Sequence, residues 1–214
     1  LIEPVTKNQV LSETAPLPLG LRSHADQARH WQTSLPQTRQ AKGWGGKIAD
    51  ILAVGNTNQD ISMNLSLSGT NLWQAGESVD EFTITPQGSV GISNLEGIEL
   101  FDFILGQRLE NILDQTYNDV LKQTYVKKVQ ESQIQHERYT AALKNRTPLS
   151  TQFSQTQISR QLRMVADSIA IAGYLGMSRQ TFYVKFGGFD NHGELLNNHS
   201  GRLSLFSAAI DEFY

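Results

Sequence analysis

Hydrophobic and polar residues alternate along this chain with two periods, one typical of β-strands and one typical of α-helices. Residues 61–68 alternate strictly between apolar and polar, a period of two that predicts a half-exposed strand. A second strand is predicted over 81–85, before a Pro-Gln-Gly turn. A third is predicted over 181–186, where Thr, Phe, Tyr and Val form a β-prone run that ends in two glycines. The pattern therefore predicts three strands.

Elsewhere in the chain, apolar residues recur every three or four positions, the spacing of amphipathic helices. The first 21 residues lack this spacing and are predicted to be irregular. Ser23 or Asp26 is suited to cap the first predicted helix, and Thr147–Pro148 ends the longest helical stretch. Helical structure is predicted over five segments: 25–33, 47–53, 100–144, 158–172 and 194–213.

The order of helix, strand and helix at the end of the chain predicts an α/β fold with a parallel sheet flanked by helices. We expect the N-terminal part of the α/β core, with a small strand segment, over 1–99. A helical insertion over 100–148 is expected to lie over the sheet as a lobe. The C-terminal part of the core then follows over 149–214 and carries the 181–186 strand.

The composition changes this picture little, but it excludes several functions. At 214 residues, with 39% hydrophobic and 18% charged residues, the chain suits one globular domain or one domain with an inserted lobe. A formal net charge of -3 offers no basic surface for nucleic acid, and no apolar run is long enough to span a membrane. Cysteine is absent, which excludes disulfides, thiolate catalysis and cysteine-bound metal. We therefore expect neither nucleic acid nor membrane as a partner.

The candidate chemistry gathers where the third strand ends. Gly187 and Gly188 lead into Asp190 and His192, an acid and an imidazole at the carboxyl end of a strand, where open α/β sheets build their sites. Asp and His are the usual oxygen and nitrogen ligands of zinc-like metals, so the two side chains can converge on one ion. The alternative is that Asp190 caps the following helix and that His192 is a solvated loop residue. The spacing alone leaves both interpretations open.

His199, in the last predicted helix, is a third candidate. It belongs to a stripe of residues spaced by three and four, which predicts that it faces the core: Leu196, His199, Leu203, Phe206, Ile210 and Phe213. A histidine in this position is either a hydrogen-bonded core residue or a ligand that points back towards the sheet edge. Because His199 lies roughly two helical turns from Asp190 and His192, it can reach the same site.

A second constellation, Ser23 and His24, stands at the start of the first predicted helix. The unpaired N–H groups and positive dipole end there can stabilise a phosphorylated or sulfated serine, or favour its alkoxide beside a metal. Arg22 is available to pair with a bound oxyanion. The alternative is that Ser23 only caps the helix.

Two further groups are interpreted as structural. The Gly-Trp-Gly-Gly sequence at 43–46 fits neither a Walker nor a Rossmann pattern, and it predicts a tight helix entry with Trp44 packed beneath it. His136, inside the charged helical block, is predicted to be solvated.

Three motifs together resemble the bacterial domain of unknown function 1501 family. They are Leu-Gly-Leu-Arg-Ser-His-Ala-Asp-Gln at 19–27, Gly-Trp-Gly-Gly-Lys at 43–47, and Gly-Gly-Phe-Asp-Asn-His at 187–192 with His199. The resemblance covers the whole chain, and the last motif is its most specific part. That family is similar to the alkaline phosphatase and sulfatase superfamily, and its members are mostly exported by the twin-arginine route. The resemblance therefore implies an alkaline-phosphatase-like parallel sheet between helices and a periplasmic or secreted location.

The resemblance also implies a function, the metal-dependent hydrolysis of phosphate or sulfate esters. Ser23 falls at the nucleophile position, and His24 is a candidate ligand or proton shuttle. Asp190, His192 and His199 match the region that would bind a divalent metal of the zinc, calcium or magnesium class. A small-molecule or polysaccharide ester is the expected substrate. The alternative is a non-catalytic exported module with the same fold that binds a polyanion or a partner.

The chain departs from this family at both ends. Such proteins usually begin with a strand and a Gly-Gly-Asn-Asp-like acidic loop and end with a late Asp-His pair, and neither feature is in this sequence. We therefore expect an internal fragment that holds half of the site, lacks central strands and is inactive alone.

Overall fold

A small, mostly parallel β-sheet organises the molecule. The structure is a computed structural model that describes residues 6–12, 14, 17–20, 23–91 and 100–214. Within these residues the strand order is β3-β2-β1-β4. Strand β1 (Asn64–Ser66) pairs in parallel with β2 (Phe82–Thr85) on one side and with β4 (Thr181–Tyr183) on the other, and β3 (Gly88–Ser89) forms an antiparallel hairpin with β2. The protein is therefore a mixed α/β fold, and each strand predicted from the sequence has a counterpart in the sheet.

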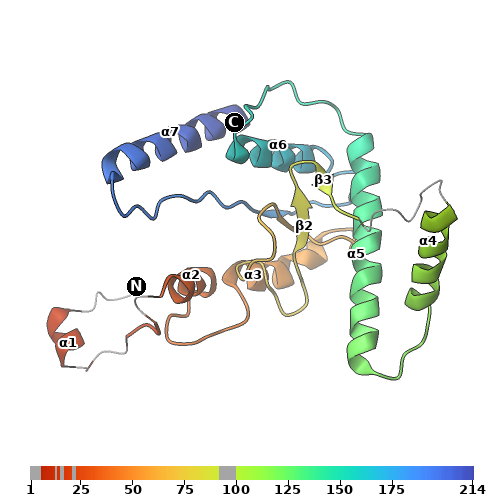
Figure 1. The fold of residues 1–214 in the computed structure, drawn as a ribbon, viewed down its shortest axis with the longest axis horizontal. Helices are drawn as coiled ribbons and strands as arrows, with labels where there is room; N and C mark the ends of the chain where they lie inside the picture. Colours follow the sequence, from red (N-terminus) through yellow and green to blue (C-terminus); the bar gives the residue numbers. More distant parts are fainter. Residues whose placement is uncertain (1–5, 13, 15–16, 21–22, 92–99) are drawn as a thin grey trace.

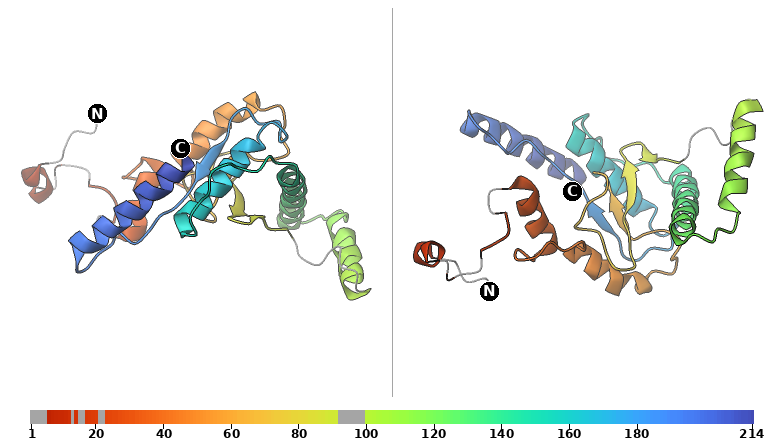
Figure 2. Two further views of the ribbon diagram at one scale, coloured as in Figure 1. Left: turned by 90° about the horizontal axis from the view of Figure 1, so that it is seen from above. Right: turned by 60° about the horizontal axis from the view of Figure 1, so that its bottom comes forward.

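The described residues also form seven α-helices and one short 3-10 helix: α1 (Lys7–Leu11), α2 (His24–Thr33), α3 (Trp44–Leu52), η1 (Ala53–Gly55), α4 (Leu100–Leu113), α5 (Val120–Lys144), α6 (Gln157–Ala170) and α7 (Leu195–Phe213). Helices α3 and α6 cover opposite faces of the sheet, and α5 lies along its β3 edge (Figure 1 and Figure 2). Helix α7 packs on α6, α2 adjoins α3, and α4 pairs with α5 at the far end of the molecule from α7.

Side-chain caps set where several helices begin. Ser23, Asp119 and Thr156 each accept a hydrogen bond from the backbone N–H three residues later, at the starts of α2, α5 and α6. Thr6 does the same for α1, and the Gln9 side chain accepts from the Thr6 N–H to complete a capping box. The prediction of irregular structure over the first 21 residues is therefore wrong for 7–11, because the capping box specifies a helix turn that has no apolar periodicity.

Strand β1 is shorter and more buried than its alternating pattern predicts. All three of its residues are buried, including the polar Asn64 and Ser66. The Asn64 side chain donates to the Gln74 carbonyl oxygen at 2.9 Å and accepts from the Thr181 hydroxyl at 2.6 Å. The Gln74 side chain donates to the Leu65 carbonyl oxygen at 3.2 Å. The prediction of a half-exposed strand is wrong, because an amide-rich loop covers the polar face and supplies its hydrogen bonds.

The hydrophobic core joins the sheet to helices α5 and α6. Leu65 and Ile84 are buried strand residues, and Tyr139 reaches them from α5 with no exposed surface. The Tyr139 ring meets Phe82 edge-on at a centroid distance of 5.6 Å, and its hydroxyl lies 2.6 Å from Ser168 Oγ on α6. This one side chain therefore connects the strand layer with both helices.

The glycines at 43–46 allow a loop to lie directly against helix α3. The helix begins at Trp44, three residues before its predicted start, with Gly43 as its N-cap. A Cβ atom on Gly45 would lie 2.5 Å from Cε2 of Trp73, and the Trp73 ring meets the Trp44 ring edge-on at 5.1 Å. The prediction of a tight helix entry with a packed Trp44 is confirmed, and close backbone packing explains the glycines.

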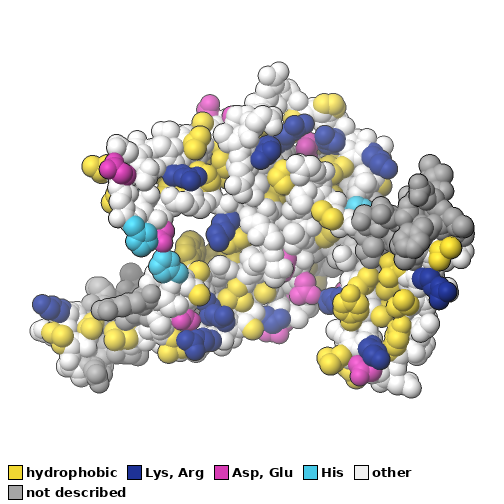
Figure 3. Space-filling model, viewed as in Figure 1, with side chains coloured by type: hydrophobic (Ala, Val, Ile, Leu, Met, Phe, Trp, Pro, Cys, Tyr) yellow, Lys and Arg dark blue, Asp and Glu magenta, His cyan; other side chains and the backbone are white. Residues whose placement is uncertain are grey.

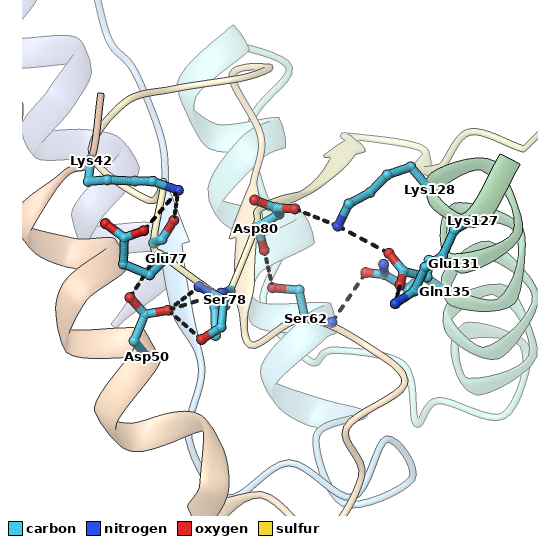
Figure 4. A network of polar contacts seen from close by, with 12 residues as sticks. Lys42, Asp50, Ser62, Glu77, Ser78, Asp80, Lys127, Lys128, Glu131 and Gln135 are labelled. Atoms are coloured by element: carbon cyan, nitrogen blue, oxygen red, sulfur yellow. Dashed lines mark hydrogen bonds and ion pairs between the residues drawn. The ribbon is translucent and has the colours of Figure 1, made fainter. Parts of the chain in front are cut away.

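Polar contacts hold segment 76–80 between α3 and α5 (Figure 4). The Asp50 carboxylate, on α3, accepts hydrogen bonds of 2.7 to 3.0 Å from three consecutive backbone N–H groups: those of Glu77, Ser78 and Val79. Partial burial acts to raise the pKa of Asp50, but these donors and the Ser78 hydroxyl outweigh it and lower the pKa to about 2. On the other side, Lys128 of α5 donates to Asp80 at 2.7 Å.

Helix α7 does not bury the stripe that the sequence predicts to face the core. Leu196 is 84% exposed and Leu203 is 47% exposed, whereas Ala209 is fully buried. Figure 1 shows that α7 lies against α6 only towards its C-terminal end and that its first turns project from the body. The prediction of a core-facing stripe is confirmed only for Phe213, which packs against the core. It is wrong for the first turns, because α7 extends beyond the surface of the body against which it packs.

Candidate functional site

Asp190 lies between two imidazoles that come from different parts of the chain. Its Oδ2 atom is 3.6 Å from Nδ1 of His24, the first residue of α2, and its Oδ1 atom is 3.5 Å from Nε2 of His192 on the same loop. Figure 3 shows histidine and acidic side chains meeting where the α2 and α7 sides of the molecule approach each other. The structure therefore brings together His24, Asp190 and His192 from the set that the sequence predicts.

The three side chains form a surface site. Those of His24 and His192 are 80% and 89% exposed, and that of Asp190 is 64% exposed. Ion pairs in such a setting contribute little to stability, so a ligand can rearrange them at small cost. A neutral imidazole offers a nitrogen lone pair, and the carboxylate offers two oxygens. The cluster can therefore offer ligands to a cation.

Aromatic packing fixes the loop that carries Asp190. Phe186 stacks on Phe206 of α7 at 6.1 Å, and Phe189 meets Phe186 edge-on at 5.6 Å. The Arg202 guanidinium lies over the Phe186 ring, 5.6 Å from its centroid, as a cation–π contact. Gly188 has a φ of 92°, and a Cβ atom there would lie 2.6 Å from Arg202 Cζ. The backbone conformation at Gly188 thus favours glycine, and a Cβ atom there would also displace the exposed Arg202 guanidinium from its place over Phe186.

Asp190 does not cap the helix that follows it. Helix α7 begins at Leu195, its N-cap is Glu194, and no side-chain hydrogen bond closes this end. The interpretation of Asp190 as a helix cap is therefore wrong. The Asp190 carboxylate is left for the contacts with His24 and His192.

Ser23 caps helix α2, which was the alternative to its interpretation as a nucleophile. Its hydroxyl accepts a hydrogen bond of 3.2 Å from the backbone N–H of Asp26 and so caps α2. A hydrogen bond from Arg39 lowers the pKa of Asp26, against the opposing effect of desolvation, and Ser23 lowers it further. Ser23 precedes His24, so its hydroxyl stands one residue from the contact with Asp190. Arg22, predicted to pair with an oxyanion, lies outside the described residues.

His199 joins the loop through an aromatic contact. Its ring meets Phe189 edge-on at a centroid distance of 5.6 Å, and the residue is exposed on α7. The prediction that His199 faces the core is wrong for the same reason as for the first turns of α7. In this arrangement His199 supports Phe189, the residue before Asp190.

The donor set fits a zinc-class metal in chemistry and in pairwise spacing. Ligand atoms on a tetrahedral zinc ion lie about 3.3 Å apart, close to the 3.5 and 3.6 Å that separate Asp190 oxygens from the two imidazole nitrogens. His24 and His192, however, contact different oxygens of Asp190. Over the part of the chain that the structure describes, no group of three or more His, Asp or Glu side chains is arranged to hold a metal ion. Metal binding would therefore require the exposed imidazoles to rotate towards one oxygen.

The sequence did not reveal which residues pack against the loop that carries Asp190. It also did not reveal the contact between His136 and Ser89. Phe186, Phe206 and Arg202 carry no catalytic chemistry, and only their aromatic and cationic character pointed to a packed cluster. His136, predicted to be solvated, is half-buried, and its Nδ1 atom lies 2.8 Å from Ser89 Oγ. That prediction is wrong, because α5 lies along the edge strand β3 and presents His136 to it.

Comparison with known proteins adds no relative. A scan against protein-family models, a search of curated proteins and a search of solved structures each found no match. Among the described residues, no helix is both long enough and apolar enough to cross a membrane.

Proposed function

We propose that this chain carries a metal-dependent site for the hydrolysis of phosphate or sulfate esters. The observation that carries the proposal is the position of the Asp190 carboxylate between His24 and His192. One carboxylate and two imidazoles are a donor set typical of catalytic zinc sites. Asp190 and His192 lie on the loop that leads from the parallel strand β4 to α7, and Asp190 comes seven residues after the strand ends at Tyr183.

The architecture supports a core similar to that of the alkaline phosphatase and sulfatase superfamily. Strands β2, β1 and β4 are parallel and lie between α3 and α6. The resemblance of the motifs at 19–27, 43–47 and 187–192 to the domain of unknown function 1501 family points the same way. We extend the proposal to export into the periplasm or medium and to small-molecule or polysaccharide esters as substrates.

The proposal assigns a role to each residue of the site. Asp190 and His192 would hold a divalent metal of the zinc, calcium or magnesium class, with His24 as a further ligand or as a proton shuttle. The bound metal would polarise the ester oxygen and lower the pKa of the nucleophile. Ser23 is the candidate nucleophile, at the N-terminus of α2 where backbone N–H groups favour an oxyanion. His199 supports the loop through Phe189.

Turnover of aryl phosphate and aryl sulfate tests the proposal. The full-length protein that contains this chain is assayed after chelation and after addition of zinc, calcium or magnesium. We expect metal-dependent turnover that is lost in Ser23→Ala and in Asp190→Ala. His30→Ala, a histidine of α2 away from Asp190, is the matched control and keeps activity. Turnover that is unchanged in both Ser23→Ala and Asp190→Ala would disprove this function.

A second candidate is a non-catalytic exported module that binds a glycan. The observation that favours it is Trp31, which is 72% exposed and stacks on Trp44 at a centroid distance of 6.4 Å. A rigid, exposed indole face suits the C–H groups of a sugar ring. Saturable quenching of tryptophan fluorescence by an oligosaccharide, lost in Trp31→Ala and without ester hydrolysis, would favour this candidate.

A further inference from the structure

One face of helix α2 leads from Asp190 to an exposed tryptophan. His24, the first residue of α2, contacts Asp190, and Trp31 lies seven residues further along the same helix. Seven residues of α-helix make almost two turns and span about 10 Å, so the two side chains project from the same face. Both residues are exposed, and so are Gln27 and Ala28 between them. This face of α2 is therefore open from His24 to Trp31.

A series of aromatic rings braces Trp31 against the sheet. Its indole stacks on Trp44, the first residue of α3, at a centroid distance of 6.4 Å with the ring planes 12° apart. The Trp44 ring meets Trp73 edge-on at 5.1 Å, and its Nε1 atom donates to the Trp31 carbonyl oxygen at 3.2 Å. Trp73 in turn stacks on Tyr183 of β4 at 6.1 Å. Trp31 is therefore held in one orientation although it is 72% exposed, and a ligand would not have to order it.

The two ends of this face would recognise different parts of one ligand. At the Trp31 end, the flat indole offers an apolar surface to the C–H groups of a pyranose ring. Ala28, between the ends, has a side chain too short to block a sugar that lies along the helix. At the other end, His24 and Asp190 are the residues assigned above to the ester group. A monosaccharide ester is too short to occupy both ends, whereas an oligosaccharide ester can do so.

We propose that Trp31 is a substrate-binding residue for an oligosaccharide whose phosphate or sulfate ester lies at Asp190. This role rests on the proposed hydrolase function, and it narrows the substrates from esters in general to esters carried by a sugar chain. Trp31 would contact a sugar ring about 10 Å along the helix from the reacting bond. Its contribution is therefore to affinity, since a contact that is equal in the ground state and the transition state does not accelerate the chemical step.

The affinity for sugar esters of different length tests this role without requiring turnover. Calorimetric titration of the full-length protein that contains this chain compares mannose 6-phosphate with mannopentaose 6-phosphate. We expect the longer ester to bind at least about tenfold more tightly. Trp31→Ala should remove most of that difference, and Trp31→Phe should keep part of it, because an aromatic face remains. Tyr174→Ala is the matched control, since it removes an aromatic residue that is 70% exposed but distant in the chain from α2, and it should keep the full difference.

Steady-state kinetics with the same two esters separates substrate binding from a structural role. Trp31→Ala should lower kcat/KM for mannopentaose 6-phosphate about tenfold, with the loss carried by KM and not by kcat. Equal affinity of the wild type for the two esters, or a length dependence that survives Trp31→Ala, would overturn this role of Trp31 even where aryl esters are hydrolysed. Trp31-dependent binding of unesterified mannopentaose, without turnover of any aryl ester, would instead overturn the hydrolase function and, with it, the path from Trp31 to Asp190.

Discussion

Nδ1 of His24 lies 3.6 Å from Oδ2 of Asp190, which joins the start of α2 to the loop after β4. The two residues come from opposite ends of the chain, and each was singled out by a separate motif. Their contact is exposed and therefore contributes little to stability. Because stability does not depend on this contact, we place the proposed function at His24 and Asp190.

Metal affinity provides the first prediction. Replacing Asp190 with Asn or His24 with Ala removes a donor from the cluster, and we expect zinc affinity to fall at least about tenfold in each variant. The measurement is competition with a chromophoric chelator. His199→Ala should have a smaller effect, because that ring contacts Phe189 and not the carboxylate. Equal loss in His199→Ala and Asp190→Asn would place the metal elsewhere on α7.

The paired glycines of the loop provide the second prediction. Gly188→Ala should strain the loop, because the backbone φ of 92° disfavours alanine, and it should displace the exposed Arg202 guanidinium from Phe186. Gly187→Ala is the matched control, since a Cβ there meets nothing within 4 Å. We expect Gly188→Ala to reduce zinc affinity and to cost about 1 to 2 kcal/mol of unfolding free energy. Chelator competition measures the zinc affinity, and urea unfolding measures the stability. Equal zinc affinity and equal stability of Gly188→Ala and Gly187→Ala would contradict the conclusion that the loop needs glycine at 188.

Local signals predicted much of the fold. The helix start at Ser23 follows from its capping side chain, and the strand before Gly187 follows from its β-prone residues. The burial of Asn64 was not predictable, because its partners Gln74 and Thr181 are distant in the chain. Alternation reports only which residues are polar, and a polar residue can be satisfied inside the protein as well as by water.

The site was predictable in chemistry but not in geometry. The residue types marked Asp190 and His192, whereas the pairing of Asp190 with His24 depends on the contact between α2 and the loop. His199 shows the limit of periodicity. Its stripe on α7 has the spacing of a buried face, yet the helix is long and packs only near its C-terminal end. Periodicity identifies which face of a helix is apolar and does not reveal how much surface is available to cover it.

Stability in acid provides the third prediction. The N–H donors of segment 77–79 and the Ser78 hydroxyl hold the pKa of Asp50 at about 2, below the value near 4 of an unfolded chain. Because the folded pKa is depressed, the stabilisation is present above about pH 4 and is lost as the pH falls towards 2. We expect Asp50→Asn to lower the free energy of unfolding by about 1 to 2 kcal/mol at pH 7. On acidification from pH 7 to pH 2, the variant should lose less unfolding free energy than the wild type does. Urea unfolding between pH 2 and pH 7 measures this, with the exposed Asp114→Asn as the control. Parallel pH profiles for Asp50→Asn and the wild type would contradict the conclusion that the ionised Asp50 carboxylate stabilises segment 77–79.

Stability in alkali provides the fourth prediction. Burial raises the pKa of Tyr139 to about 12, despite the hydrogen bond with Ser168, whereas an unfolded tyrosine titrates near 10. The folded phenol therefore keeps its proton over a range where the unfolded chain releases it, so Tyr139 lowers stability progressively as the pH rises above about 10. Tyr139→Phe should cost about 1 kcal/mol at pH 8 through the lost hydrogen bond, and its stability should fall less steeply above pH 10. Tyr174→Phe is the control, because Tyr174 is 70% exposed. Urea unfolding at pH 8, 10 and 11 separates the variants, and an equal slope for Tyr139→Phe and the wild type would show that the phenol is not held neutral in the core.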